Sequence, residues 1–371
     1  MGAFFERFFE DFTRSREFAD IELLNPLDMH LHLRQGAMLE SVLPFSARHF
    51  ALGVVMPNLN PPITTTALAL VYRDEIARLS RGEDFTPLMT LYLHENLSLE
   101  ELKEAVAQGI RILKLYPKGA TTGSENGVRE VLSDRILEIL SWAQDLGFML
   151  SIHGESNGYC MDREFEFLEV YEFLARSFPR LKIVIEHMSD RRSLESLEKY
   201  ENLYATLTLH HILLSLDDVL GGLMQPDLFC KPMIKTPNDR DALLLCALNA
   251  HPKVSFGSDS APHLQSKKYS MSAPGGIFSA PVALSVLASV FAYYDKLENL
   301  QRFVSDNACK NYALDSILCD THKVMRLVPQ AWEIPSSIVC EGDAISVLFG
   351  GRQSVFRQVR IESRELSNTD I

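Results

Sequence analysis

Short runs of apolar residues alternate along the chain with longer stretches in which apolar residues recur every three or four positions. The short runs have the length and β-branched content of buried strands, and the longer stretches have the period of amphipathic helices. The predicted strands are Ile21–Met29, Gly53–Met56, Leu88–Leu93, Ile112–Leu115, Met149–Ile152, Lys182–Ile185, Leu203–Leu209 and Val254–Gly257. The predicted helices between them include Thr66–Leu79, Leu99–Ala107, Val128–Leu146, Arg163–Ser177 and Arg240–Leu248. This alternation predicts an α/β fold with a parallel sheet, and eight strands predict closure into a (β/α)8 TIM barrel.

The two ends of the chain fall outside this alternation. The first residues, MGAFFERFFEDF, mix charged and aromatic side chains, which predicts a short amphipathic helix and not a secretory signal. From Ser316 onward the alternation stops, although Ala344–Phe349 followed by two glycines predicts a small strand and a turn. We therefore expect an N-terminal segment of residues 1–20, a barrel of residues 21–315 and a C-terminal extension of residues 316–371 packed on the barrel.

Composition narrows the possible functions. The chain has 371 residues, 46 % hydrophobic and 23 % charged, which is ordinary for a globular protein. Its formal net charge of −13 disfavours nucleic acid and anionic membrane surfaces as partners. The long uncharged stretch Tyr269–Tyr294 is interrupted by Pro274 and Pro281, which predicts a buried helix after a loop and no membrane span. The six cysteines are scattered without a C-x-x-C pair, which predicts free thiols and a cytoplasmic protein.

Polar residues gather near the carboxyl ends of the predicted strands. In a barrel these ends converge on the face where active sites are built. The polar residues are His30, His32, Asn58, His94, Glu95, Lys114, His153, His187, His210 and Asp259. Such a series is hard to obtain by chance, so we expect these side chains to meet at one mouth of the barrel.

Four histidines and an aspartate in this series are candidate metal ligands. Side chains of a strand alternate between its faces, so His30 and His32 point the same way and can clasp one Zn²⁺ ion. The alternative is that they line a polar rim, and the lone His153 and His187 could likewise be core or rim residues. Asp259 could bind a metal and accept a proton, or it could cap a helix.

Lys114 is unusual because it lies within an apolar strand, in Ile-Leu-Lys-Leu-Tyr-Pro. An ammonium group in a barrel mouth would be costly to desolvate and would be repelled by metal ions. Either it pairs with a carboxylate, or its neutral amine adds CO₂ to form an anionic carbamate that can bridge two metals. The spacing of the residues leaves both possibilities open.

These residues lie in motifs that resemble those of dihydroorotase, closest to the shorter, single-enzyme bacterial type of the amidohydrolase superfamily. The resemblance runs from Asn25 to Tyr312, and the motifs follow the family's order. They are His30-x-His32-x-Arg34, Met56-Pro57-Asn58, Lys114-Leu-Tyr-Pro with Ala120-Thr121-Thr122, His153-Gly-Glu, Glu186-His187 and Asp259-Ser-Ala-Pro-His263.

The resemblance implies two Zn²⁺ ions per subunit, bridged by hydroxide and by carbamylated Lys114 (N6-carboxylysine). It places one ion on His30, His32, Lys114 and Asp259, and the other on Lys114, His153 and His187. It assigns substrate binding to Arg34, Asn58, Thr121, Thr122, Lys231, His263 and Gly275. The segment Lys118–Gly127, rich in Gly, Ser and Thr, corresponds to a mobile loop that closes over the substrate, although a merely flexible connection is the alternative.

The sequence departs from the family's pattern at Lys231, where an apolar residue is expected. The expected substrate contact at this position comes from the backbone, so the change puts little in doubt. Gly275 supplies the other backbone contact, and a glycine permits close approach. No role is assigned to His210 or His211, for which packing is the default interpretation.

The resemblance implies a metal-dependent enzyme that interconverts N-carbamoyl-L-aspartate and L-dihydroorotate in de novo pyrimidine (UMP) biosynthesis. In ring opening, a hydroxide that bridges the metals attacks the ring carbonyl, and Asp259 delivers its proton to the departing nitrogen. One alternative is a related cyclic amidase of the hydantoinase or allantoinase kind, whose rings lack the carboxylate that Arg34, Asn58 and His263 would grip. The other is a non-catalytic dihydroorotase-like partner of aspartate transcarbamoylase, but the ligand set is intact. A homodimer is compatible with the sequence.

Overall fold

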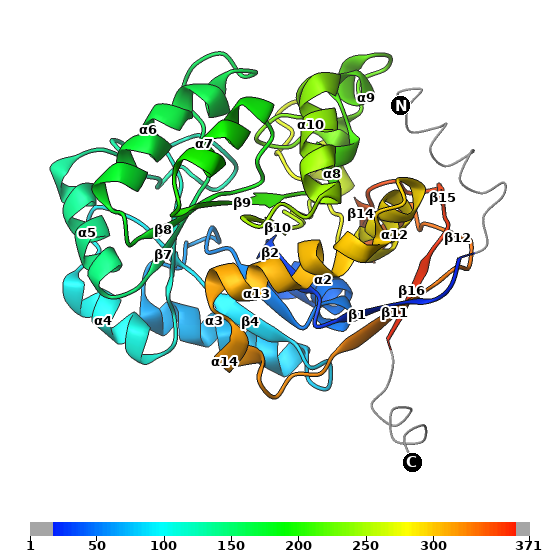
Figure 1. The fold of residues 1–371 in the computed structure, drawn as a ribbon, viewed down its shortest axis with the longest axis horizontal. Coiled ribbons are helices and arrows are strands. Elements are labelled where there is room, and N and C mark those ends of the chain that lie inside the picture. The colour runs from blue at the N-terminus through cyan, green and yellow to red at the C-terminus, as the bar shows by residue number, and fades with distance from the viewer. Residues whose placement is uncertain (1–17, 361–371) are drawn as a thin grey trace.

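A ring of parallel strands forms the centre of the computed structural model, which describes residues 18–360 (Figure 1). Hydrogen bonds join the strands in the orders β2-β3-β4 and β5-β6-β7-β8-β9-β10. The strands are β2 Leu27–Leu31, β3 Leu52–Val55, β4 Thr86–Met89, β5 Leu91–Tyr92, β6 Ile112–Leu115, β7 Met149–Ile152, β8 Lys182–Ile185, β9 Leu203–Leu207 and β10 Val254–Phe256. β4 and β5 follow each other directly and together form one strand of the barrel, so the nine short strands make eight. The predicted α/β barrel is confirmed.

The ring closes between its first and last strands. The backbone N–H of Asp259 donates to the carbonyl of His30 at 2.8 Å, and the N–H of His32 donates to the carbonyl of Ser260 at 3.0 Å. The strands β2, β3, β6 and β7 are buried along their whole length, as expected for parallel strands covered on both faces.

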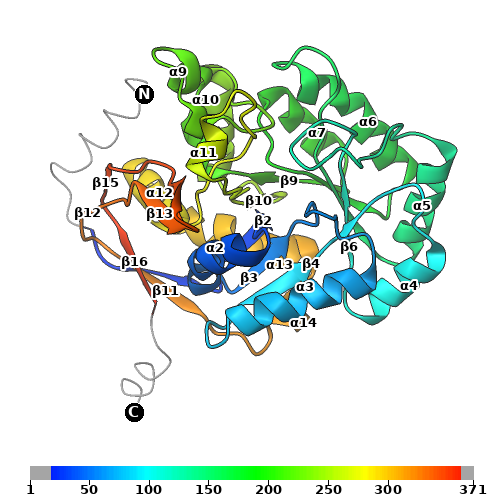
Figure 2. The same ribbon diagram turned by 180° about the vertical axis from the view of Figure 1, so that it is seen from behind.

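Helices surround the strands on the outside (Figures 1 and 2). They are α2 Gly36–His49, α3 Thr66–Leu79, α4 Leu99–Ala107, α5 Asp134–Asp145, α6 Arg163–Ser177, α7 Leu194–Lys199, α8 Leu209–Leu213, α9 Leu216–Leu220, α10 Pro237–Leu248, α11 Gln265–Lys268, α12 Ala283–Tyr293, α13 Asn307–Tyr312 and α14 Asp315–Leu318. Short turns of other helix types are η1 Arg191–Ser193, η2 Pro226–Leu228, η3 Leu297–Asn299 and η4 Arg302–Asp306. Local capping sets several boundaries: α10, for example, starts with a Thr236–Asp239 capping box and has a proline in its first turn.

The predicted strand Ile21–Met29 is wrong as a single element. The structure divides it into β1 Ile21–Leu24 and β2, with Asn25 between them at a positive φ of 45°. The strand β1 pairs antiparallel with β11 Val324–Val328, far along the chain (Figure 1). Asn25 fixes this arrangement because its side chain donates to the carbonyl of Thr321 at 2.7 Å and accepts from the N–H of Lys323 at 2.8 Å.

Two other predicted elements end earlier or begin later than expected. The strand Leu203–Leu209 stops at Leu207, because the Thr208 hydroxyl caps α8 by accepting from the N–H of His211 at 3.0 Å. His210 and His211 therefore lie in helix α8 and not at a strand end. The helix predicted over Val128–Leu146 begins only at Asp134, after a turn.

The C-terminal region forms small antiparallel sheets beside the barrel. β11 also pairs with β16 Arg357–Arg360, β12 Trp332–Glu333 pairs with β15 Gln353–Ser354, and β13 Ser337–Cys340 pairs with β14 Asp343–Ser346. The strand predicted over Ala344–Phe349 thus ends at Ser346. The predicted N-terminal helix falls on residues 1–17, outside the described residues.

The uncharged stretch Tyr269–Tyr294, which includes α12, is long enough for a membrane span on length alone. The structure divides it into a loop and the eleven-residue α12, whose residues from Ala283 to Ala292 are all buried. The prediction of a buried helix after a loop is confirmed. Among residues 18–360, no helix is both long and apolar enough to cross a membrane.

Asp28 links the first strand of the barrel, β2, to the segment that follows the last strand, β10. This fully buried carboxylate accepts from the backbone N–H of Ser258 at 2.8 Å, from the Ser258 hydroxyl at 2.5 Å and from the N–H of His30 at 3.2 Å. Asp28→Ala should lower the urea midpoint of unfolding, because each buried donor left without a partner costs about 1–3 kcal/mol. Glu22→Ala, which removes an exposed ion pair to Arg326, should leave the midpoint nearly unchanged. Equal shifts in the two variants would contradict the proposed linking role.

Candidate active site

A pocket opens where the strands end, and it collects most of the residues that the sequence predicts. Its lining contains His30, His32, Arg34, Asn58, Tyr116, Thr121, Thr122, His153, His187, Lys231, Asp259, Ala261, Gly275 and Gly276. Five residues that were expected at this mouth or assigned to the site are absent from the lining: His94, Glu95, Lys114, His210 and His263. Lys114 is fully buried in β6, and His263 lines the neighbouring hollow and contacts Arg34.

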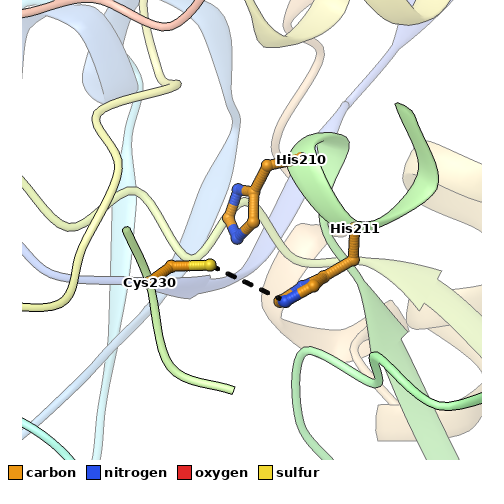
Figure 3. Close-up of side chains that lie close together, drawn as sticks. All are labelled: His210, His211 and Cys230. Carbon is orange, nitrogen blue, oxygen red and sulfur yellow. Dashed lines mark hydrogen bonds between the residues drawn. The ribbon is translucent and has the colours of Figure 1, made fainter. Parts of the chain in front are cut away.

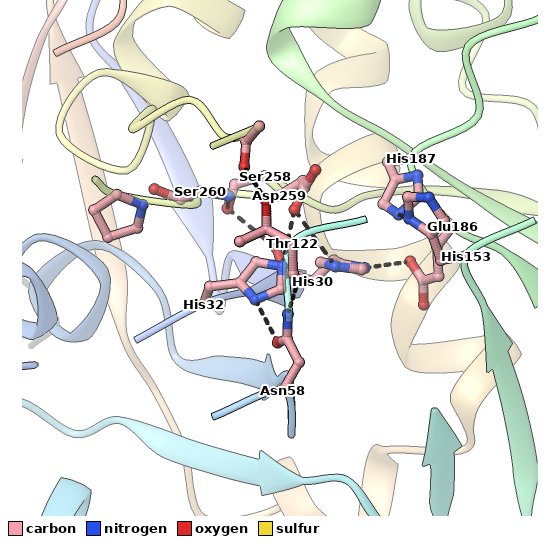
Figure 4. Close-up of polar contacts among 12 residues, drawn as sticks. His30, His32, Asn58, Thr122, His153, Glu186, His187, Ser258, Asp259 and Ser260 are labelled. Carbon is pink, nitrogen blue, oxygen red and sulfur yellow. Dashed lines mark hydrogen bonds and ion pairs between the residues drawn. The ribbon is translucent and has the colours of Figure 1, made fainter. Parts of the chain in front are cut away.

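His30, His32 and Asp259 form the first ligand group (Figure 4). One oxygen of Asp259 lies 3.5 Å from Nε2 of His30 and 3.1 Å from Nε2 of His32. The other ring nitrogen of His30 donates to Glu186 at 2.8 Å, and that of His32 donates to the Asn58 carbonyl oxygen at 2.9 Å. With these protons placed, two imidazole lone pairs and a carboxylate oxygen face one another, so the group fits a cation.

His153 and His187 form the second group, beside the first. Nε2 of His153 donates to Glu155 at 2.7 Å, which leaves Nδ1 facing Nε2 of His187 at 3.1 Å. The rings of His187 and His30 lie 5.0 Å apart between centroids. The structure therefore brings all four predicted histidine ligands together, each with a nitrogen directed at another ligand.

Burial favours the neutral form, which metal binding needs, at His30, His32 and His187, because it lowers the pKa of each. The pKa of His32 lies well below its ordinary value, first because of burial and then because of Arg34 and Lys114. The pKa of His187 is likewise well below its ordinary value because of burial and the neighbouring histidines. Burial raises the pKa of Asp259, against the positive charges around it.

The backbone at several site residues lies in the left-handed region. The φ values are 62° at Arg34, 41° at His187 and 41° at Asp259. This conformation is uncommon for residues other than glycine, and it tends to occur where a fold must aim a functional side chain.

Glu186 is a functional residue that sequence reasoning left without a role. Its carboxylate accepts from His30 at 2.8 Å, from Ser151 at 2.5 Å and from Thr206 at 2.6 Å. Burial alone would raise its pKa, but the charges and hydrogen bonds of His30, Lys114 and Ser151 outweigh burial and lower the pKa to about 2. Glu186 thus holds His30 in one tautomer and orientation. The sequence did contain a signal for Glu186, because a carboxylate at the end of an apolar strand directly precedes the candidate ligand His187. Glu155, two residues after His153, is a similar signal.

Lys114 lies between these charged groups without a hydrogen bond. Its amine is fully buried and has no hydrogen-bond partner among residues 18–360. Burial lowers the pKa of Lys114 to about 8, although Glu186 and Asp259 oppose the shift. A lone buried amine with a lowered pKa is suited to react with CO₂, whereas a structural ammonium would be expected to have acceptors.

Arg34 is a half-buried, positively charged residue that lines the same pocket. It donates from Nε to the carbonyl of Pro262 at 3.2 Å, and Nη2 lies 3.2 Å from Nε2 of His263. Within the described part of the chain, no carboxylate lies within ion-pair distance of its guanidinium. A half-buried guanidinium without a carboxylate partner among the described residues is suited to bind an anionic ligand.

The loop Lys118–Gly127 lies against the pocket. Its base is fixed by the N–H of Lys118, which donates to the carbonyl of Val128 at 2.9 Å. At its tip, Asn58 Nδ2 donates to the carbonyl of Thr122 at 3.2 Å, and the Lys231 ammonium donates to the carbonyl of Ala120 at 3.0 Å. The loop therefore reaches the ligand groups through Asn58, which also orients His32.

Replacing Thr121 and Thr122 together with alanine should reduce turnover while leaving the metal content intact. Both side chains line the pocket, yet neither belongs to a ligand group. A substrate misplaced by about 1 Å loses up to about 10²-fold in rate, which sets the expected scale. Steady-state kinetics and metal analysis of the same sample provide the test. Unchanged kinetics would mean that the loop is only a connection.

Comparisons with known proteins agree with this geometry. No family model matches the chain. Curated relatives include dihydroorotases from Helicobacter hepaticus, 60 % identical over 79 % of this chain and 85 % of that protein, and from Helicobacter pylori strain P12, 52 % identical over 90 % of this chain and 96 % of that protein. The crystal structure of dihydroorotase from Campylobacter jejuni has a TM-score of 0.87 at 42 % identity, and it covers 93 % of this chain and 99 % of that chain.

The chain belongs to the dihydroorotase family. The predicted resemblance and the dihydroorotase function are confirmed over the two alternatives. An L-hydantoinase from Arthrobacter aurescens has a TM-score of 0.72 at only 12 % identity, so this likeness shows a shared barrel fold and says nothing of the substrate of this chain.

Proposed function

We propose that this dihydroorotase interconverts N-carbamoyl-L-aspartate and L-dihydroorotate by means of two zinc ions and a carbamylated lysine. The single observation that carries the proposal is the convergence of imidazole lone pairs on the Asp259 carboxylate, beside the Lys114 amine, which has no hydrogen-bond partner among residues 18–360. One ion would be held by His30, His32, Asp259 and Lys114, and the other by His153, His187 and Lys114. Bound zinc would supply a Lewis acid and a hydroxide nucleophile at neutral pH.

Asp259 moves the proton in this proposal. In ring opening its carboxylate takes a proton at the site of attack and delivers it to the departing amide nitrogen. In ring closure the protonated form starts the cycle, and the same transfers run in reverse. Its neighbours are compatible with the role, since the ring nitrogens of His30 and His32 that face its oxygen carry no proton in the tautomers assigned above.

The substrate's carboxylate would lie on Arg34, His263 and Asn58. Burial lowers the pKa of His263 to about 2, with Arg34 adding to the shift, so its ring is neutral and can donate one hydrogen bond. Asn58 Nδ2 would donate its hydrogen bond to the substrate in place of the Thr122 carbonyl. Thr121 and Thr122 would contact the substrate from the loop, and the backbones of Lys231 and Gly275, which line the same pocket, would contact it as well.

The decisive assay follows ring opening of dihydroorotate and of hydantoin by the zinc-loaded protein. Turnover of dihydroorotate that is lost on chelation and restored by zinc would support the proposal. Turnover of hydantoin without turnover of dihydroorotate would overturn the substrate assignment.

Arg34→Gln should lower kcat/KM for dihydroorotate by about 10- to 150-fold. A charge-assisted hydrogen bond contributes about 1.5–3 kcal/mol, and glutamine keeps a donor but loses the charge and the paired geometry. Arg180→Gln, at an exposed arginine paired with Asp145, is the matched control and should leave kinetics unchanged. If both variants behaved like the parent protein, Arg34 would not bind the carboxylate.

A further inference from the structure

A second cluster of metal-binding side chains lies outside the ligand groups described above (Figure 3). It consists of His210 and His211 on helix α8 and Cys230 on the segment that precedes Lys231. One potential ligand atom from each residue lies within 4.8 Å of the others, and all three residues are buried. None of the three has a role in the proposed reaction.

His210 is the residue that points to a missing ligand. It is fully buried, and neither of its ring nitrogens has a hydrogen-bond partner in the described part of the chain. A neutral imidazole has both a donor and an acceptor, and each one left unsatisfied in the interior is costly. Figure 3 shows the ring directed toward the space between Cys230 and His211, and its centroid lies 4.5 Å from that of His211.

The other two members are held in place by their neighbours. His211 lies 2.9 Å from the Thr208 hydroxyl through Nδ1 and donates from Nε2 to the carbonyl of Pro232 at 3.0 Å. The Cys230 thiol donates to the same carbonyl at 3.3 Å, and its sulfur lies 3.9 Å from Nε2 of His211. Protein hydrogen bonds thus hold His211 and Cys230 close to the His210 ring without a bound metal.

We propose that His210, His211 and Cys230 form a separate metal site with one sulfur and two nitrogen donors. This donor set suits Zn²⁺ and other borderline-soft transition ions and does not suit Mg²⁺ or Ca²⁺. On binding, the Cys230 thiol loses its proton to solvent. The proton on Nε2 of His211 shifts to Nδ1, which then donates to Thr208, and Nε2 takes the metal. The ligand groups at the barrel mouth contain no sulfur, so the two kinds of site differ chemically.

The cluster is connected to the pocket through the chain at Cys230. Cys230 directly precedes Lys231, which lines the pocket and donates to the loop carbonyl of Ala120. A metal bound by Cys230 would anchor this segment to helix α8. The chemistry of sulfur ligation nevertheless allows the site to be tested without reference to turnover.

Cobalt substitution of the full-length protein provides the test, because thiolate ligands give Co²⁺ a near-ultraviolet charge-transfer band that nitrogen and oxygen ligands do not. The metal-free protein is titrated with Co²⁺, and zinc content is measured separately after dialysis. We expect the band in the parent protein and its loss in Cys230→Ser, with one zinc ion fewer per chain in Cys230→Ser and in His210→Gln. Cys340→Ser is the matched control, because Cys340 is also buried but lies in β13.

Two outcomes would overturn the proposal: no charge-transfer band in the fully loaded parent protein, or a band that persists in Cys230→Ser. Should Cys230→Ser fail to fold, X-ray absorption at the zinc edge of the parent protein decides the question. A sulfur neighbour would support the site, and its absence would refute it. Neither readout depends on whether the ligand groups at the barrel mouth act as proposed.

Discussion

Lys114→Ala should abolish most turnover and should prevent the protein from retaining both metal ions. The lysine amine is buried without a hydrogen-bond partner among residues 18–360, and the proposal makes its carbamate a ligand of both ions. Loss of an outer-shell partner of a metal ligand already costs about 10–100-fold, so loss of a shared ligand should cost more than about 100-fold. Metal analysis and ring-opening kinetics on one preparation measure both effects.

Direct evidence for the modification comes from isotopically labelled bicarbonate. A carbamate carbonyl resonance should appear in the parent protein, should be absent in Lys114→Ala, and should persist in a control variant, Lys323→Met. Lys323 is a matched control, because it is also buried but donates to the carbonyls of Ala47 and Phe50 and has no free amine to modify. Short carboxylic acids should restore a little activity to Lys114→Ala. Two bound metal ions beside an unmodified lysine would refute the role.

The sequence predicts that the candidate metal ligands converge, because their positions follow from strand geometry. His30 and His32 must share a face, and the carboxyl ends of barrel strands must converge, so ligands separated by more than two hundred residues can be placed together. The residues that orient these ligands by hydrogen bonds cannot be predicted in the same way. The hydrogen bonds of Glu186 to His30 and to Thr206 depend on how neighbouring strands are aligned, and no local pattern reports that alignment.

One error in the predicted fold, the single strand Ile21–Met29, has the same origin. The apolar run from Ile21 to Met29 is compatible with one strand, and only the bonds of Asn25 to Thr321 and Lys323 divide it. Those partners lie almost the whole chain away. The early end of β9 is a different case, because Thr208 is a good helix cap and the sequence contained that signal. The prediction of a strand as far as Leu209 placed His210 at the barrel mouth, whereas His210 lies in helix α8, in the buried cluster with Cys230.

Asp259→Asn should produce a folded protein that retains much of its metal but turns over far more slowly. Asparagine keeps the size and one ligating oxygen, yet it cannot accept a proton. General acid–base catalysis contributes about 10²–10⁴ in rate, which sets the expected loss. Asp239→Asn is the matched control, since Asp239 is a buried carboxylate that caps α10 away from the pocket, and asparagine can cap as well.

The dependence on pH separates a proton-transfer role for Asp259 from simple ligation. Ring opening needs the ionised carboxylate, so its rate should rise as pH increases through the pKa of the site. Ring closure needs the protonated form, so its rate should fall over the same range, with one apparent pKa governing both directions. In Asp259→Asn the residual rates should lose this opposed dependence on pH. Near-normal rates in Asp259→Asn would remove the residue from the proton transfer and would direct attention to His263, which contacts Arg34.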